Sequence, residues 1–229
     1  MSILFLVRHA QASFGQDDYD KLSDLGHRQS EWLGEYFAAR NILFDRVVTG
    51  AMTRHRETLD GINKGMRQTA NGVQEHAGWN EFDFMTLIEL FMEQHPDTRP
   101  APDASRREWY GILKKSLLAW SEDTIDRTGT AMESWSDFRS RVTRALEQIQ
   151  ADSDGSDHKV LVVSSGGSIS AALQQVLDLP AASMVQLNLQ TRNTGLHSCV
   201  FNAHSISLSS FNNTPHLDTR ERQQFITYT

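Results

Sequence analysis

The chain has 229 residues, of which 39% are hydrophobic and 22% charged, and its formal net charge is -7 at pH 7. This apolar content argues against a disordered or fibrous chain, and the negative charge argues against nucleic acid or an anionic membrane as a partner. The single cysteine, Cys199, excludes an intramolecular disulfide framework. The apolar start MSILFLV is too short for a signal-peptide core or a membrane helix, so we expect a soluble, cytoplasmic globule.

The first half of the chain alternates short apolar runs with segments whose apolar side chains recur at helical spacing. In chain order these predict a strand over residues 2–7, a helix capped by Ser23, a strand over residues 44–48 and a helix from Met52 to about Asn63. The apolar face of the first helix is formed by Leu25, Trp32, Leu33, Tyr36 and Phe37. The next stretch is polar and predicts a surface connection, which leads to the aromatic segment WNEFDF.

The second half continues the alternation. Its predicted elements are a helix over residues 85–94, a proline-rich loop, a helix marked by Trp109, Leu113, Leu117 and Trp120, a helix over residues 136–150, a strand over residues 159–163, a further helix and an edge hairpin over residues 196–211. Such alternation predicts an α/β protein with a mainly parallel sheet and helices on both faces. We expect one domain over residues 1–229, with residues 85–130 as a helical insertion.

The run LVRHAQASFG places Arg8 and His9 directly after the first predicted strand. Ligands of open α/β sheets gather at the carboxyl ends of the strands. The arginine fork matches phosphate oxygens, and a neutral imidazole is a nucleophile that can accept a phosphoryl group. The pair therefore predicts phosphoryl transfer, although a strand-end Arg and His could also do no more than cap the sheet.

Three further segments carry candidate groups. In TGAMTRHRET, Arg54 lies near the start of a predicted helix, where unpaired N–H groups already attract anions. We expect His55 and Arg56 to point elsewhere on that helix, either solvated or packed. In VLVVSSGGSIS, the two glycines permit a tight turn whose amides can bind an anion, and the neighbouring serines, among them Ser165, supply hydroxyl donors.

The aromatic segment WNEFDF contains Glu81, whose pKa apolar neighbours could raise enough for proton donation to a leaving group. Asp83 is the rival carboxylate in the same segment. Either residue could also be a solvated loop carboxylate.

Taken in this order, the Arg-His pair followed by Gln11, the distant turn with Arg54, the acid beside aromatics and the strand ending in a Gly-Gly loop resemble the histidine phosphatase superfamily, also called phosphoglycerate-mutase-like. The resemblance spans nearly the whole chain. It implies a three-layer α/β/α sandwich with a helical cap and a reaction that needs no metal or cofactor. His9 takes the place of the phosphorylated nucleophile, Arg8 and Arg54 those of phosphate ligands, and Glu81 that of the acid that protonates the leaving group.

The chain departs from the family pattern at two positions. Ala10 replaces the usual glycine after the nucleophile, a small-for-small change. Ser165 stands where the family usually has a second histidine, so a hydrogen bond is retained but a charge-assisted one is lost. A branch with Ser or Thr at this position, and with a later N-T-G segment as in residues 193–195, fits the sequence. His197 and His204 are expected to be strand residues, although one of them could replace the missing histidine in space.

The resemblance implies a phosphomonoester hydrolase that acts on a small phosphorylated substrate, with Gln11, Ser13 and Gly166 contributing to substrate binding. Phosphoglycerate-mutase-type transfer is one alternative. A weakly active or non-catalytic phosphate-binding module is another, since Ser165 could mark lost catalysis. The insertion, through Arg99, Arg106, Arg107 and Trp109, could line a cap that selects the substrate. The oligomeric state is not indicated by the sequence.

Overall fold

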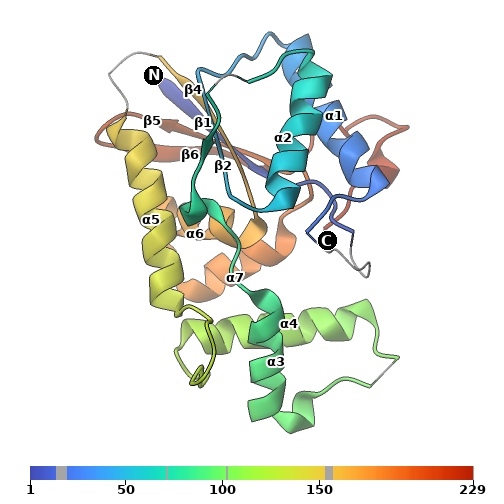
Figure 1. The fold of residues 1–229 in the computed structure, drawn as a ribbon, viewed down its shortest axis with the longest axis vertical. Coiled ribbons are helices and arrows are strands. Elements are labelled where there is room, and N and C mark those ends of the chain that lie inside the picture. Colours follow the sequence, from blue (N-terminus) through green and yellow to red (C-terminus); the bar gives the residue numbers. More distant parts are fainter. Residues whose placement is uncertain (14–19, 71, 102, 153–156, 229) are drawn as a thin grey trace.

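The computed structural model describes residues 1–13, 20–70, 72–101, 103–152 and 157–228. At its centre lies a six-stranded sheet with the strand order β3-β2-β4-β1-β5-β6 (Figure 1). The strands are β1 (Ser2–Arg8), β2 (Arg46–Thr49), β3 (Gln74–Glu75), β4 (Lys159–Ser164), β5 (Leu196–Phe201) and β6 (Ile206–Asn213). The first four are parallel to one another, whereas β5 and β6 form an antiparallel hairpin at one edge.

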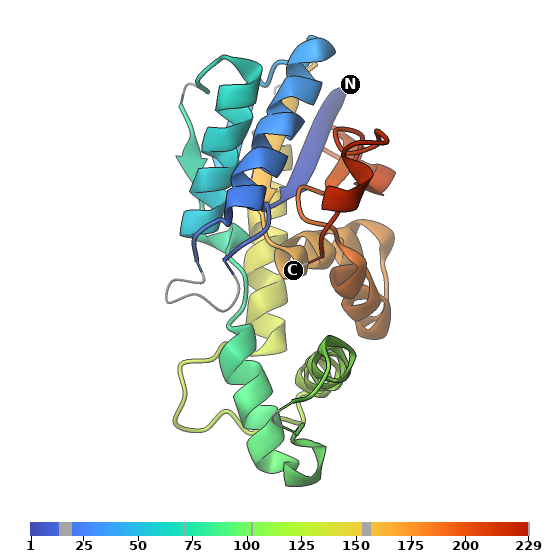
Figure 2. The same ribbon diagram turned by 90° about the vertical axis from the view of Figure 1, so that its right-hand side faces the viewer.

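Helices cover both faces of this sheet. They are α1 (Asp24–Ala39), α2 (Thr53–Met66), α3 (Phe84–Gln94), α4 (Arg106–Ser121), α5 (Trp135–Ala151), α6 (Gly166–Leu177) and α7 (Ala181–Gln190), with short 3-10 turns η1 (Ala77–Trp79), η2 (Pro96–Thr98) and η3 (Gln223–Phe225). Helices α1 and α2 pack together on one face, while α5 and α6 lie on the other (Figure 2). The predicted three-layer α/β/α architecture is confirmed.

The period-two alternation of the strands divides the core into two hydrophobic clusters. Leu6 belongs to the cluster that contains Val142 of α5 and Ile169 of α6. The next residue, Val7, belongs to the cluster that contains Leu33 of α1. Successive side chains of a strand point to opposite faces, so a strand with both faces covered is apolar throughout.

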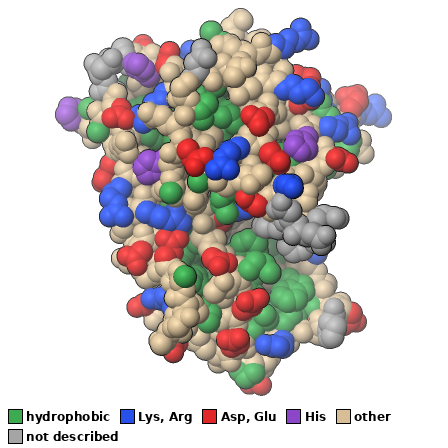
Figure 3. Space-filling model, viewed as in Figure 1, with side chains coloured by type: hydrophobic (Ala, Val, Ile, Leu, Met, Phe, Trp, Pro, Cys, Tyr) green, Lys and Arg blue, Asp and Glu red, His purple; other side chains and the backbone are tan. Residues whose placement is uncertain are grey.

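Helices α3 and α4 lie beyond the carboxyl ends of the parallel strands (Figure 1). Trp120 of α4 is fully buried against Phe82, Trp135 and Phe138, which ties this helix pair to α5 and to the WNEFDF segment. Hydrophobic side chains also gather on the surface over these two helices (Figure 3). No helix in the described part of the chain is long and apolar enough to span a membrane.

The predicted elements are found with modest changes of boundary. Ser23 caps α1 as predicted, its side chain accepting the Gly26 N–H at 3.0 Å, and residues 196–211 form most of the edge hairpin. The second strand begins at Arg46 rather than at residue 44. Strand β3 was missed because its residues are both exposed and polar, and α7 because it buries only Met184 and Val185.

Leu161 lies in the central strand β4 and is fully buried, so truncating it tests this core directly. We expect Leu161→Ala to lower the free energy of unfolding by about 2–5 kcal/mol, because both transfer free energy and packing are lost. Leu43→Ala is the matched control, since Leu43 is 56% exposed and should change stability by less than about 0.5 kcal/mol. Urea titration followed by circular dichroism measures both, and equal effects would contradict the packing described.

Candidate active site

The carboxyl ends of β1, β2 and β4 meet at one edge of the sheet. The His9 N–H donates to the Ser164 carbonyl at 2.8 Å, and the Gly50 N–H donates to the Val163 carbonyl at 3.1 Å. These backbone bonds bring the residues that come after each strand together. The segments that contain Arg8, Arg54 and Ser165 therefore converge as the sequence predicts.

His9 is buried, with 3% of its surface exposed, and its Nδ1 lies 2.8 Å from the Ala10 carbonyl oxygen. If Nδ1 carries the proton and donates to this carbonyl, the lone pair of Nε2 is left available. Burial, followed by the charges of Arg54 and Arg8, holds the pKa of His9 well below 6.5. The neutral form of the ring is therefore favoured. Ala10 is not among the described residues with positive φ, so its replacement of glycine causes no backbone strain.

The arginines are held by partners that the sequence did not reveal. Arg54 Nη1 lies 2.8 Å from Asp20 Oδ1, and the other Asp20 oxygen accepts the Thr53 N–H at 2.8 Å. Arg8 donates from Nη1 to the carbonyls of Thr191 and Tyr228. Because Arg54 has a side chain only 3% exposed, its charge acts on the site with little screening by water.

Glu81 approaches this edge from the turn after η1. The Gly167 N–H donates to Glu81 Oε2 at 3.0 Å, and a Cβ on Gly167 would lie only 2.1 Å from Oε1, so the close approach requires glycine there. Burial raises the pKa of Glu81, although the Gly167 N–H and the charges of Arg54 and Arg8 oppose this shift. Asp83 is instead exposed and caps α3, its side chain accepting the Thr86 N–H at 3.1 Å.

Asn80 ties the turn that carries Glu81 to two strand ends. Its side-chain Oδ1 accepts the Ala51 N–H at 2.6 Å, and its carbonyl accepts hydrogen bonds from Ser168 Oγ at 2.5 Å and Arg141 Nη1 at 2.7 Å. No motif in the sequence pointed to Arg141, which reaches this turn from α5. Its contribution depends on tertiary packing alone.

The N-T-G segment holds the backbone of Arg8 and His9. Asn193 Nδ2 donates to the His9 carbonyl at 3.2 Å, and the Thr194 N–H donates to the Arg8 carbonyl at 3.1 Å. Thr227 Oγ1 in turn donates to Asn193 Oδ1 at 2.8 Å. This segment therefore supports the Arg-His pair from the side of β5.

Ser165 has an unexpected neighbour. Its Oγ lies 2.7 Å from Nε2 of His55, which is fully buried and whose ring centroid lies 5.9 Å from that of His9. The prediction that His55 points elsewhere on its helix is wrong. Arg56 does point away and forms an exposed ion pair with Glu75.

Neither tail histidine takes the place beside Ser165 that His55 occupies. His197 is buried in β5, where its Nδ1 accepts the Asn212 N–H at 3.1 Å, and burial lowers its pKa to about 3. His204 is exposed between β5 and β6. The sequence could have suggested His55 only through its position next to Arg54.

The comparison with known families decides the family of this chain. The sequence profile of the histidine phosphatase superfamily (branch 1) matches residues 4–214. The chain belongs to this superfamily.

The relatives and solved structures agree with this membership. The chain is 26% identical over 184 residues to a broad-specificity phosphatase of Saccharomyces cerevisiae, covering 75% of this chain and 68% of the yeast protein. It is 27% identical over 187 residues to the adenosylcobalamin/alpha-ribazole phosphatase of Salmonella typhi, covering 79% and 82% of the two chains. The phosphoserine phosphatase of Entamoeba histolytica, solved with 3-phosphoglyceric acid, has the same fold, with a TM-score of 0.65 at 21% identity over 95% of this chain and all of that one.

The loop after His9 of this histidine phosphatase packs onto the start of α1. Gln11 Oε1 accepts a hydrogen bond from Ser23 Oγ at 2.8 Å, and the Ser13 N–H donates to the Lys21 carbonyl at 2.8 Å. Phe14 and Gly15, the end of the first motif, lie outside the described residues. Gly166 begins α6, where a Cβ would lie 3.5 Å from Arg8 Nε. Substrate contact by Gln11, Ser13 and Gly166 stays a prediction.

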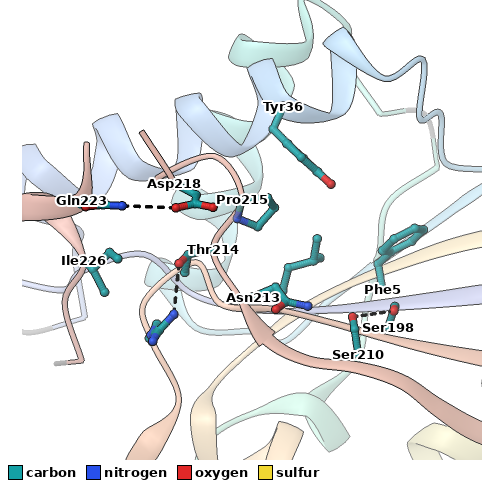
Figure 4. A pocket seen from close by; sticks show the side chains of 12 residues that line it. Phe5, Tyr36, Ser198, Ser210, Asn213, Thr214, Pro215, Asp218, Gln223 and Ile226 are labelled. Atoms are coloured by element: carbon teal, nitrogen blue, oxygen red, sulfur yellow. Dashed lines mark hydrogen bonds between the residues drawn. The ribbon is translucent and has the colours of Figure 1, made fainter. Parts of the chain in front are cut away.

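A separate pocket of about 600 Å³ lies between α1, the hairpin strands and the C-terminal segment (Figure 4). Tyr36, Arg192 and Asp218 are among its lining residues, and Gln223 donates to Asp218 at 3.3 Å. The described catalytic candidates do not line it. It is therefore distinct from the site at the strand ends.

The charge of Arg54 should be visible in the titration of His9. We expect Arg54→Met to raise the pKa of His9, because one of the two guanidinium charges that oppose imidazolium formation is removed. Arg56→Met is the matched control, since Arg56 lies on the same helix but points outward to Glu75. Long-range ¹H–¹⁵N spectra of the imidazoles measure both titrations, and an equal shift in the two variants would contradict the described geometry.

Proposed function

We propose that this protein hydrolyses phosphomonoesters in two steps through a phosphohistidine at His9, without a metal ion. The observation that carries the proposal is the convergence of the strand ends on a buried His9, with Glu81 bound to the Gly167 N–H at 3.0 Å. Burial and the charges of Arg54 and Arg8 lower the pKa of His9, whereas burial raises the pKa of Glu81. A neutral nucleophile and a protonated acid are the two forms that the first step consumes.

In the first step, Nε2 of His9 attacks phosphorus while the ester P–O bond breaks. Glu81 gives its proton to the departing oxygen, and the alcohol leaves. Arg8, Arg54 and Ser165 bind the equatorial oxygens, whose negative charge the guanidinium groups stabilise. His9 then carries the phosphoryl group.

In the second step, water attacks phosphorus and gives a proton to the Glu81 carboxylate, while the P–N bond breaks. Inorganic phosphate leaves, and both His9 and Glu81 return to their starting forms. Glu81 thus serves as acid and then as base.

We assign substrate selection to residues 85–130, which form α3, α4 and the connections around them as a cap over the strand ends. Tyr110 of α4 donates a hydrogen bond to the Leu189 carbonyl, and the charge of Arg8 acts on its pKa. Met85 and Trp109 are 53% and 42% exposed on the same helix pair. The predicted cap arginines, Arg99, Arg106 and Arg107, are also exposed.

Steady-state hydrolysis of p-nitrophenyl phosphate tests the nucleophile. We expect His9→Ala to lower kcat by about 10⁴-fold or more, because the covalent route is lost, and His27→Ala, a change at an exposed histidine of α1, to leave it unchanged. Exhaustive chelation should not affect the wild type. Alkaline denaturation during turnover should trap a phosphoryl group on Nε2 of His9.

Activity that disappears on chelation would contradict the metal-free mechanism. Activity that persists in His9→Ala would contradict the assignment of the nucleophile. A wild type that binds phosphate but shows no turnover at acidic or neutral pH would point to a phosphate-binding module.

The pH dependence of kcat/KM tests Glu81. Protonation of His9 below its lowered pKa removes the nucleophile, and ionisation of Glu81 above its raised pKa removes the acid, so we expect a maximum on the acidic side and a decline as the pH rises. Glu81→Gln should abolish this decline and slow an aliphatic phosphoester by about 10²–10⁴-fold. Its effect on p-nitrophenyl phosphate should be smaller, because that leaving group departs as an anion. Asp83→Asn, which preserves a helix cap, should leave the profile unchanged, and an equal effect of both variants would overturn the assignment.

A further inference from the structure

His55 is a buried polar side chain that the mechanism above does not use. It lies in the first turn of α2, directly after Arg54, and none of its surface is exposed. Its Nε2 is 2.7 Å from Ser165 Oγ, and its ring stands 5.9 Å from the ring of His9. The imidazole therefore lies against two residues of the candidate site.

The surrounding backbone is shaped to admit this ring. A Cβ on Gly50 would lie 2.3 Å from Nδ1 of His55, so only glycine leaves enough space at that position. Burial and Arg54 lower the pKa of His55, and a backbone interaction with Gly50 opposes this shift. In the described part of the chain, however, Nδ1 has no partner with hydrogen-bond geometry. Nε2 and its contact with Ser165 thus fix the orientation of the ring.

Ser165 is also unusual for a serine at the start of a helix. A serine at this position normally accepts an N–H of the first turn of the helix. Ser165 precedes α6 but makes no such bond, and the Gly167 N–H is taken by Glu81 instead. The hydroxyl of Ser165 is turned to His55.

We propose that His55 is a positioning residue, which donates from Nε2 to Ser165 Oγ and thereby directs the serine hydroxyl hydrogen toward an oxygen of the bound phosphoryl group. The inference rests on the proposed phosphatase function. A buried N–H without an acceptor is costly, which places the single ring proton on Nε2 rather than on Nδ1. A hydroxyl that already accepts one bond has its own hydrogen left for the substrate. Without His55, the hydroxyl would rotate among other acceptors.

The test compares two replacements of similar size in the intact protein. His55→Gln retains an N–H donor that can reach Ser165, whereas His55→Leu fills the space without one. With p-nitrophenyl phosphate, we expect His55→Leu and Ser165→Ala each to lower kcat by about 10²-fold with a much smaller change in KM, by analogy with the loss of one oxyanion donor. The kcat of His55→Gln should remain within about tenfold of the wild-type value, and the kcat of His27→Leu should equal the wild-type value.

The double variant His55→Leu/Ser165→Ala separates positioning from packing. Because the two residues act as one unit, we expect it to be no slower than either single variant. The proposal would be overturned if the losses of kcat in the two single variants multiplied in the double variant. It would also be overturned if His55→Gln and His55→Leu lost kcat equally. If the wild type hydrolyses phosphoesters through His9 but His55→Leu is fully active, the inference fails and the proposed function stands.

If the wild type shows no turnover, the proposed function fails, and binding of inorganic phosphate followed by ³¹P NMR replaces kcat as the readout. Equal weakening in His55→Leu and Ser165→Ala, with binding retained in His55→Gln, would support the positioning role. Unchanged binding in all three variants would overturn it.

Discussion

The structure of the site depends on one electrostatic constraint: the buried imidazole of His9 lies within the field of two guanidinium groups. In water such a ring would often carry a proton, but burial and the charges of Arg54 and Arg8 make the cation too costly. The same arginines also lower the pKa of Glu81, but there they oppose burial, which raises it. Burial of His9 and partial burial of Glu81 thus favour the uncharged form of each group.

This constraint needs a backbone that holds His9 in place. Part of that backbone, at Thr194, is conformationally strained. This β-branched residue has φ 53°, in the left-handed region, which costs about 1–3 kcal/mol. In return its N–H reaches the Arg8 carbonyl at 3.1 Å, and its Oγ1 lies 2.8 Å from His216 Nε2, in a pair that holds the turn. Burial lowers the pKa of His216 to about 3, so this contact adds no charge near the arginines. The strain is thus local and is offset by hydrogen bonds to the segment that contains Arg8 and His9.

Local sequence patterns predicted most strands of the sheet and the edge at which the candidate site lies. Prediction failed where tertiary packing determines which side chains come into contact. The strands and their ends could be predicted because apolar runs mark buried strands, and His9 comes directly after one of them. Glu81 and Asp83 could not be told apart, since the choice depends on the approach of Gly167 from a distant helix. The contacts that the first turn of α2 makes depend on how that helix packs against the sheet. For this reason neither His55, which lies in this turn, nor Asp20, which precedes α1 and accepts the Thr53 N–H, was recognised.

Ser165 stands where the superfamily usually has a histidine, yet an imidazole still lies beside it. Because this position is a serine, the segment after β4 has no imidazole of its own. In the structure, the imidazole of His55 comes from α2, and its Nε2 lies 2.7 Å from Ser165 Oγ. Because burial and Arg54 keep His55 neutral, the pair supplies a directed hydrogen bond without a further positive charge. An added cation here would stabilise the bound phosphate dianion as well as the transition state. An interaction that stabilises the bound ground state and the transition state equally does not increase the turnover rate. A neutral donor is therefore a sufficient partner for two arginines that already provide the charge.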